Sequence, residues 1–85
     1  MKYTIEFKPS AYRQFKRFPS AIAKRIDARI IALADNPRPR GVEKLAGYER
    51  AYRIRVGDYR VLYEIYDDVL VVYVIRVAHR REAYR

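Results

Sequence analysis

The sequence predicts a small α+β domain in which a helical hairpin packs on a small, mainly antiparallel sheet, followed by a short C-terminal tail. Three observations predict this fold class: an alternating segment near the N-terminus, two amphipathic segments of helical period, and three strand-like segments separated by short turns. The expected element order is β-α-α-β-β-β. A chain of 85 residues has room for one modest hydrophobic core, so we expect residues 1–85 to form a single domain.

The N-terminal half supplies the first strand and both helices. Residues 2–8 alternate aromatic or β-branched side chains with polar ones, and Pro9 ends this strand. Ser10 is the expected N-cap of a first helix over about residues 10–18. The second helix follows Pro19 and extends to about residue 34, with apolar residues at intervals of four and three: Ile22, Ile26, Ile30 and Leu33.

The C-terminal half supplies a loop and three strands. The loop covers residues 35–47, and Val42 and Leu45 are its expected anchors. The three strands are joined by short turns and therefore predict an antiparallel meander. They cover about residues 49–56, 59–66 and 69–77, with two-residue turns at Gly57-Asp58 and Asp67-Asp68. The last strand is apolar from Val69 to Ile75, which predicts a central position with both faces covered.

The chain is strongly basic. Nineteen Lys and Arg residues against ten Asp and Glu give a formal net charge of +9, and the pI is near 10.1. This charge attracts polyanions, so nucleic acid is the first expected partner class and an acidic protein the second. There is no cysteine, which excludes disulfides and thiolate metal ligands and agrees with a reducing cytosol. Without an apolar run of about 20 residues or a signal peptide, we expect a soluble, cytoplasmic protein with no membrane partner.

Two strands of the predicted meander carry arginine at alternating positions. Arg53 and Arg55 project from one face of their strand, and Arg60 opens the next strand after Gly57-Asp58. Guanidinium groups match phosphate oxygens in a bidentate way, so the hairpin predicts a phosphate-binding surface. Alternating arginine is also typical of any half-solvated strand, and on this pattern alone both interpretations stay open.

The residues after the last strand are also cationic. His79, Arg80 and Arg81 follow the apolar strand directly. If the middle hairpin pairs with that strand, one concave patch is lined by Arg53, Arg55, Arg60, Arg80 and Tyr84.

Five segments carry a family resemblance. They are Tyr3 to Phe7, the break Phe15-Lys16-Arg17-Phe18-Pro19, Lys44-Leu45, the hairpin from Tyr52 to Tyr63, and the ending from Ala78 to Arg85. In their order and spacing they resemble the RelE/ParE superfamily of toxins from bacterial and archaeal toxin-antitoxin modules. The resemblance implies a compact microbial ribonuclease fold that acts as an mRNA interferase. Such a protein is a ribosome-dependent mRNA endoribonuclease that inhibits translation and is neutralised by an antitoxin.

The resemblance also implies partners and rival functions. The expected partners are a cognate antitoxin, mRNA in the ribosomal A site and 16S-type ribosomal RNA, and no cofactor is implied. The ParE branch shares the fold but inhibits DNA gyrase, which makes gyrase inhibition the leading rival. A third possibility is a toxin whose catalytic residues have decayed, leaving a DNA-binding partner of the antitoxin.

The resemblance assigns residue roles position by position. Arg53 and Arg55 match two basic positions where the best-known member has lysines, Arg60 opens the next strand, and Arg80 follows the last one. RNA cleavage without a metal needs a base, an acid and positive charge on the developing phosphorane. Arg60 and Arg80 are therefore the expected transition-state clamps. The expected phosphate-binding residues are Arg53, Arg55 and Arg81.

The general base stays open between two residues. Tyr84 matches the C-terminal tyrosine of the family, and a tyrosine hydroxyl needs neighbouring cations to ionise near neutral pH. His79 is the sole histidine, and imidazole is the side chain that titrates near neutrality. Arginine stays protonated, so Arg53 and Arg55 are not expected to take a proton.

Overall fold

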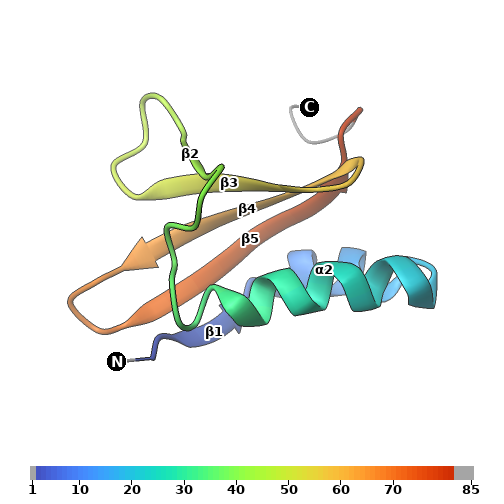
Figure 1. Cartoon of the computed structure of the whole chain (residues 1–85), viewed down its shortest axis with the longest axis horizontal. Coiled ribbons are helices and arrows are strands. Elements are labelled where there is room, and N and C mark those ends of the chain that lie inside the picture. Colours follow the sequence, from blue (N-terminus) through green and yellow to red (C-terminus); the bar gives the residue numbers. More distant parts are fainter. Residues whose placement is uncertain (1, 82–85) are drawn as a thin grey trace.

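The predicted α+β class is confirmed. A computed structural model describes residues 2–81, in which two helices pack on a five-stranded mixed sheet (Figure 1). The elements are β1 Thr4–Phe7, α1 Pro9–Lys16, α2 Ser20–Ala32, β2 Glu43–Lys44, β3 Ala51–Val56, β4 Tyr59–Tyr66 and β5 Val71–His79. No helix within the described part of the chain has the length and apolar character needed to cross a membrane.

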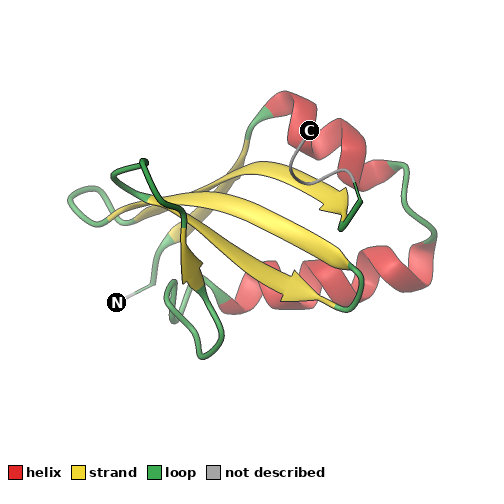
Figure 2. Ribbon diagram, turned by 90° about the horizontal axis from the view of Figure 1, so that it is seen from above, coloured by secondary structure: helices red, strands yellow, loops and turns green. Residues whose placement is uncertain are grey.

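The sheet is mainly antiparallel, as predicted. Its strand order is β1-β5-β4-β3-β2, with β3, β4 and β5 forming the meander and β1 pairing parallel to β5. Both helices lie on the same face of the sheet (Figures 1 and 2). Figure 2 looks onto the opposite face, which no helix of residues 2–81 covers. We call it the open face.

The helix ends differ from the sequence prediction. Lys8, not Ser10, is the N-cap of α1, and it makes no side-chain capping hydrogen bond. Pro9 begins the helix because its fixed φ suits the first helical position, where no N–H is needed. At the other end, α2 stops at Ala32 because the N–H groups of the next three residues bond to carbonyls three positions back.

A short strand lies inside the predicted loop. Glu43 and Lys44 form β2 and pair with Arg53 and Tyr52 of β3. A strand of two residues is too short to show any period, so the sequence pattern did not predict it. Val42 and Leu45, on either side of β2, are partly buried, and Val42 packs against the core as expected.

The predicted boundaries and surroundings of β5 were wrong. The β4–β5 turn has four residues, 67–70, because Tyr66 pairs with Val71, and β5 continues to His79. Val69 is therefore 63% exposed in the turn rather than part of the strand. β5 is interior in the sheet, but its exposure alternates along the first four residues, so only one face is fully buried.

A β-bulge explains the apolar run of β5. Tyr63 pairs with Val74, but Leu62 pairs with Arg76, so Ile75 has no partner on β4. One extra residue reverses the side to which each later residue points. Val74 and Val77 consequently both enter the core, although an odd number of positions separates them.

The core fills the space between the sheet and the helices. Ile26, Ile30 and Leu33 are at most 1% exposed, as their spacing predicted. They meet the buried side chains of the three long strands, above all the fully buried Tyr63. The Tyr63 hydroxyl donates a hydrogen bond of 2.7 Å to the carbonyl of Pro37, which ties the loop after α2 to the core.

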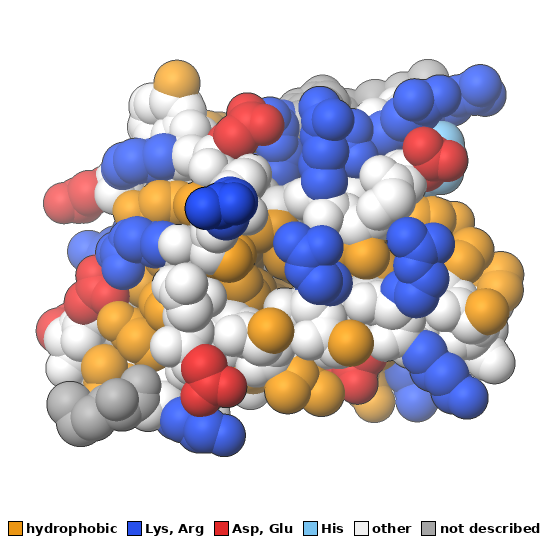
Figure 3. All heavy atoms as spheres, viewed as in Figure 1, with side chains coloured by type: hydrophobic (Ala, Val, Ile, Leu, Met, Phe, Trp, Pro, Cys, Tyr) orange, Lys and Arg blue, Asp and Glu red, His pale blue; other side chains and the backbone are white. Residues whose placement is uncertain are grey.

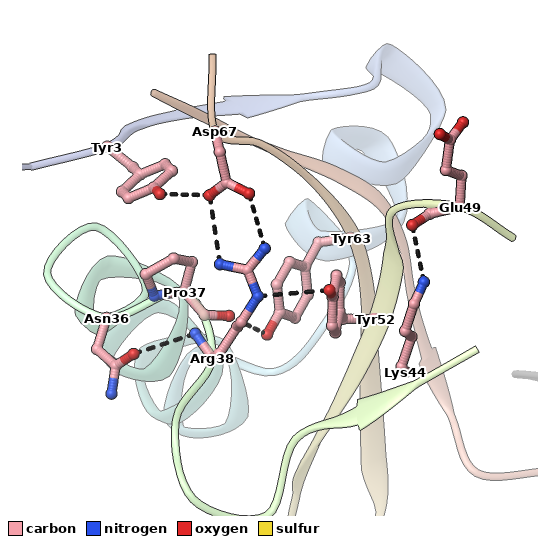
Figure 4. A network of polar contacts seen from close by, with 9 residues as sticks. All are labelled: Tyr3, Asn36, Pro37, Arg38, Lys44, Glu49, Tyr52, Tyr63 and Asp67. Atoms are coloured by element: carbon pink, nitrogen blue, oxygen red, sulfur yellow. Dashed lines mark hydrogen bonds and ion pairs between the residues drawn. The ribbon is translucent and has the colours of Figure 1, made fainter. Parts of the chain in front are cut away.

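Arg38 joins that loop to the sheet (Figure 4). Its guanidinium donates to both carboxylate oxygens of Asp67, at 2.8 and 3.3 Å, and to the Tyr52 hydroxyl at 3.4 Å. The Tyr3 hydroxyl also donates to Asp67, at 2.5 Å. Arg38, and next the Tyr3 hydroxyl, lower the pKa of Asp67 from 3.8 to about 2. This network lies at the end of the strands opposite the Gly57-Asp58 turn (Figure 1).

Replacing Tyr63 by Phe tests the buried hydrogen bond to the loop. We expect Tyr63→Phe to lower the free energy of unfolding by about 1.5 kcal/mol, because the buried Pro37 carbonyl loses its donor. Tyr66→Phe is the matched control, since it removes a hydroxyl that bonds to Glu64 in a half-buried position, and it should cost less than about 0.5 kcal/mol. Urea unfolding measures both; equal losses would contradict this account.

Acid titration tests the Asp67 network. The folded-state pKa of Asp67 lies below its unfolded value, so its stabilisation is complete above about pH 4 and is lost as pH falls to about 2. Asp67→Asn should therefore lower the urea midpoint at pH 6, and the gap from wild type should close near pH 2. Asp68→Asn is the control, because Asp68 makes no hydrogen bond or ion pair within residues 2–81. A gap that stayed constant with pH would argue against the network.

Candidate nucleic-acid interface

The register of the meander brings arginines together on the open face. Arg55 on β3 pairs with Arg60 on β4, and Arg60 pairs with Ala78 on β5. Directly opposed residues share a face, and Val56 and Tyr59, which are next in sequence, pack toward the core instead. The predicted division of β3 is therefore observed, with Arg53 and Arg55 on the face away from the helices.

Arg60 is the most enclosed of these arginines. It is 9% exposed, and its guanidinium donates to the carbonyls of Tyr59 at 3.1 Å and Gly57 at 3.5 Å. Gly57 has φ +61°, the left-handed conformation that lets the β3–β4 turn close in two residues. The side chain is thus held against the turn at the end of the hairpin.

The electrostatic environment of Arg60 shows that the other arginines lie near it. Burial lowers its pKa first, and the charges of Arg55, Arg53 and Arg80 lower it further, in that order. The Asp58 carboxylate acts in the opposite direction and raises this pKa. Burial and the neighbouring arginines disfavour the charged guanidinium, so an anion bound beside Arg60 would relieve the repulsion.

Arg53 and Arg55 differ in their partners. Arg53 forms an ion pair with the Glu43 carboxylate, and its side chain is only 15% exposed. Arg55 is exposed and makes no hydrogen bond or ion pair with any residue of the described chain. The short strand β2 thus holds Arg53 in place through Glu43, while Arg55 is available to a ligand.

The turn after β5 brings Arg80 to the same end of the sheet. Its N–H donates to the Asp58 carbonyl at 2.7 Å, which joins this turn to the β3–β4 turn. Its guanidinium lies 4.0 Å from the Asp58 carboxylate, and both side chains are more than half exposed. Arg81 is exposed in the same turn, and its N–H donates to Nδ1 of His79 at 3.3 Å.

The two candidate bases are not both found with the arginines. His79 pairs with Tyr59, and its ring meets the Tyr59 ring edge-on with 5.4 Å between centroids. Tyr59 in turn packs against Phe18, so the imidazole belongs to the helix side of the sheet and not to the face that carries Arg60. Tyr84 lies outside the described residues 2–81.

Two residues near the arginines were not predicted from the sequence. Glu43 was assigned to a loop, and its pairing with Arg53 depends on the unpredicted strand β2. Arg76 falls within the predicted last strand but was not assigned to the site; it lies on β5 opposite Leu62, which is itself opposite Arg53. The only sequence signal for this position of Arg76 is a break in the alternation of side chains after Val74. The apolar residues on both sides make that break hard to recognise.

The open face at this end is dominated by positive charge. In Figure 3, Lys and Arg side chains gather along the upper edge, on the side of the β3–β4 turn. Within residues 2–81, no three His, Cys, Asp or Glu side chains are grouped as metal ligands. The arrangement has fixed guanidinium donors and little acidic compensation, which suits the binding of phosphate groups.

Comparison with known proteins places this sequence among toxins of toxin-antitoxin systems. The sequence profile described as "ParE toxin of type II toxin-antitoxin system, parDE" matches residues 5–84. Toxin RelG of Mycobacterium tuberculosis is 35% identical over 88 residues, covering 100% of this chain and 99% of that protein. The mRNA interferase toxin RelE of Escherichia coli is 26% identical over 85 residues, covering 98% of this chain and 88% of that protein.

A solved structure extends the comparison to the fold. The archaeal RelE in the RelE–RelB complex from Pyrococcus horikoshii superposes with a TM-score of 0.84 at 28% sequence identity, covering 98% of this chain and 100% of that one. The profile covers nearly the whole chain, and both relatives are named as toxins. The chain belongs to the RelE/ParE superfamily of toxins from type II toxin-antitoxin systems.

Proposed function

We propose that this toxin is a ribosome-dependent mRNA endoribonuclease that inhibits translation. The observation that carries the proposal is the convergence of Arg53, Arg55, Arg60 and Arg80 at one end of the open face. A relative named mRNA interferase toxin RelE, similar over nearly the whole chain, supports the choice of RNA as the substrate.

Arg60 and Arg80 are the proposed transition-state clamps. The turn carbonyls hold the Arg60 guanidinium, so it need not reorganise when charge develops on the phosphate. Repulsion from the neighbouring arginines is relieved by a bound phosphodiester, and this favours an anion at that position. Arg53, Arg55 and Arg81 hold the RNA backbone on either side, as fixed or exposed guanidinium groups.

The proposed reaction needs no metal. The ribose 2′-oxygen attacks the adjacent phosphorus while a base takes its proton, and the P–O5′ bond breaks as the 5′-oxygen receives a proton. The products are a 2′,3′-cyclic phosphate and a 5′-hydroxyl. Among the residues of this chain, we assign the base to Tyr84, since His79 lies on the helix side and its Nδ1 accepts a hydrogen bond from the backbone of Arg81.

The antitoxin and the ribosome are the proposed partners. The similar archaeal RelE is solved in complex with RelB, which supports a protein antitoxin for this chain as well. A net charge of +9 favours an acidic antitoxin and contact with 16S-type ribosomal RNA, and mRNA in the A site is the substrate. The ribosome supplies substrate geometry that the small protein lacks, and it places the activity in the cytoplasm.

Removing both proposed clamps tests the function. Expression of the wild-type chain in bacteria should arrest growth and break translated messages. Arg60→Ala/Arg80→Ala should restore growth, because loss of each transition-state cation costs about 10²- to 10³-fold in rate. Arg40→Ala/Arg50→Ala removes the same charge away from the open-face arginines and should remain toxic. A folded double variant of the clamps that stays as toxic would overturn the assignment.

Gyrase inhibition is the alternative, because the matching profile describes a ParE toxin. Growth arrest with intact messages and trapped gyrase–DNA cleavage complexes would replace the ribonuclease by this function. Mapping of message ends and of DNA breaks in the same cells separates the two targets.

Single substitutions test the base. Tyr84→Phe should lower the maximal cleavage rate on programmed ribosomes by about 10²-fold while the toxin concentration at half-maximal rate stays the same, because only proton transfer is lost. His79→Gln should lower the rate by less than about threefold, because glutamine keeps an acceptor near the Arg81 N–H. The opposite ranking would assign the base to His79.

A further inference from the structure

We propose that Arg76 is a further substrate-positioning residue, which binds the RNA phosphate next to the scissile one. The inference rests on the proposed ribonuclease function and adds a residue that neither the sequence pattern nor the family resemblance assigned.

The strand register places Arg76 in one row with Arg53. Arg76 pairs with Leu62, and Leu62 pairs with Arg53, so these three side chains form a row across β5, β4 and β3. The neighbouring row toward the hairpin end consists of Ala78, Arg60 and Arg55. Both rows lie on the open face, because the intervening residues Val61 and Val77 are in the core.

The bulge at Ile75 turns Arg76 toward the open face. Had β5 continued in regular register from Val74, Arg76 would oppose Val61 and point into the core. The extra residue sends Val77 into the core and Arg76 to the open face. Bulges of this kind redirect side chains beside active sites, and this one adds a cation to the face that already carries Arg60.

Spacing indicates a different phosphate from the one at Arg60. Arg76 lies one strand across and two residues along from Arg60, and sheet geometry makes this Cα separation about 8 Å. The residues opposite Arg60 and Arg76, Ala78 and Leu62, carry no charge, and we assign a separate anion contact to each guanidinium group.

A substrate with one neutral linkage isolates this contact. Single-turnover cleavage is measured on ribosomes that carry one of two modified messages. In each message a methylphosphonate replaces one phosphate next to the cleavage site, on the 5′ side in one message and on the 3′ side in the other. Arg76→Gln should cleave the normal message about tenfold more slowly at subsaturating toxin, as expected for loss of one charged hydrogen bond. One of the two neutral messages should slow the wild type by a similar factor, and it should slow Arg76→Gln no further.

Two further variants separate binding from folding. Arg76→Lys keeps a positive charge and should recover part of the lost rate and its dependence on the neutral linkage. Arg50→Gln is the control, because it removes the same charge from a residue beside Tyr66 at the far end of the sheet. In this variant the neutral linkage should slow cleavage as much as it does in the wild type. Because each comparison is made within one variant, a general loss of stability cancels.

The results that contradict the inference are distinct from failure of the function. If the wild type cleaves but Arg76→Gln is as fast on the normal message, Arg76 does not position substrate. The same conclusion follows if the substitution and the neutral linkage slow cleavage independently, so that their factors multiply. If the wild type leaves the programmed message intact, the ribonuclease function itself fails, and the role of Arg76 fails with it.

Discussion

The structure depends on the burial of one face of the sheet and not the other. Both helices cover the same face, so strict alternation along each strand decides which side chains enter the core and which remain available to a ligand. Along β3 and β4 this alternation separates Ile54 and Val61 from Arg55 and Arg60. Along β5 it is interrupted once, at Ile75, and this single extra residue lets Val77 join the core while Arg76 joins the arginines.

Gathering like charges at one end of a small domain has a cost in stability. Arg60 is enclosed and surrounded by other cations, and both effects lower its pKa. The fold offsets part of this cost locally, through the backbone carbonyls at the β3–β4 turn and through the Glu43 carboxylate on Arg53. A polyanion would offset the remainder, so ligand binding and folding stability are linked in this protein. Residues that repel one another in the free protein are those expected to gain most from bound phosphate.

Much of this fold can be predicted from periodicity and turn residues. The Ile26–Ile30–Leu33 stripe and the Gly57-Asp58 turn fix one helix and one hairpin, and with them the common face of Arg53, Arg55 and Arg60. Periodicity does not predict structural features that are too short to show a repeating pattern. β2 has two residues, and the bulge has one, so the pairing of Glu43 with Arg53 and the place of Arg76 follow only from three-dimensional register. His79 illustrates the same limit, because its proximity to Arg80 in sequence gave no information about which face it joins.

Carboxylate placement distinguishes the structural arginines of this chain from those available to a ligand. Arg38 also carries a guanidinium charge, but both of its Nη atoms reach Asp67 and its Nε reaches Tyr52, so this charge is used within the fold. At the opposite end of the sheet, and counting residues 2–81 alone, Arg60 has only backbone carbonyls as partners and Arg80 has a carboxylate no nearer than 4.0 Å. A net charge of +9 spread evenly would give only diffuse attraction to polyanions. Concentrated where acidic partners are few and where the turn fixes the Arg60 guanidinium, the same charge suits the binding of phosphate groups at defined positions.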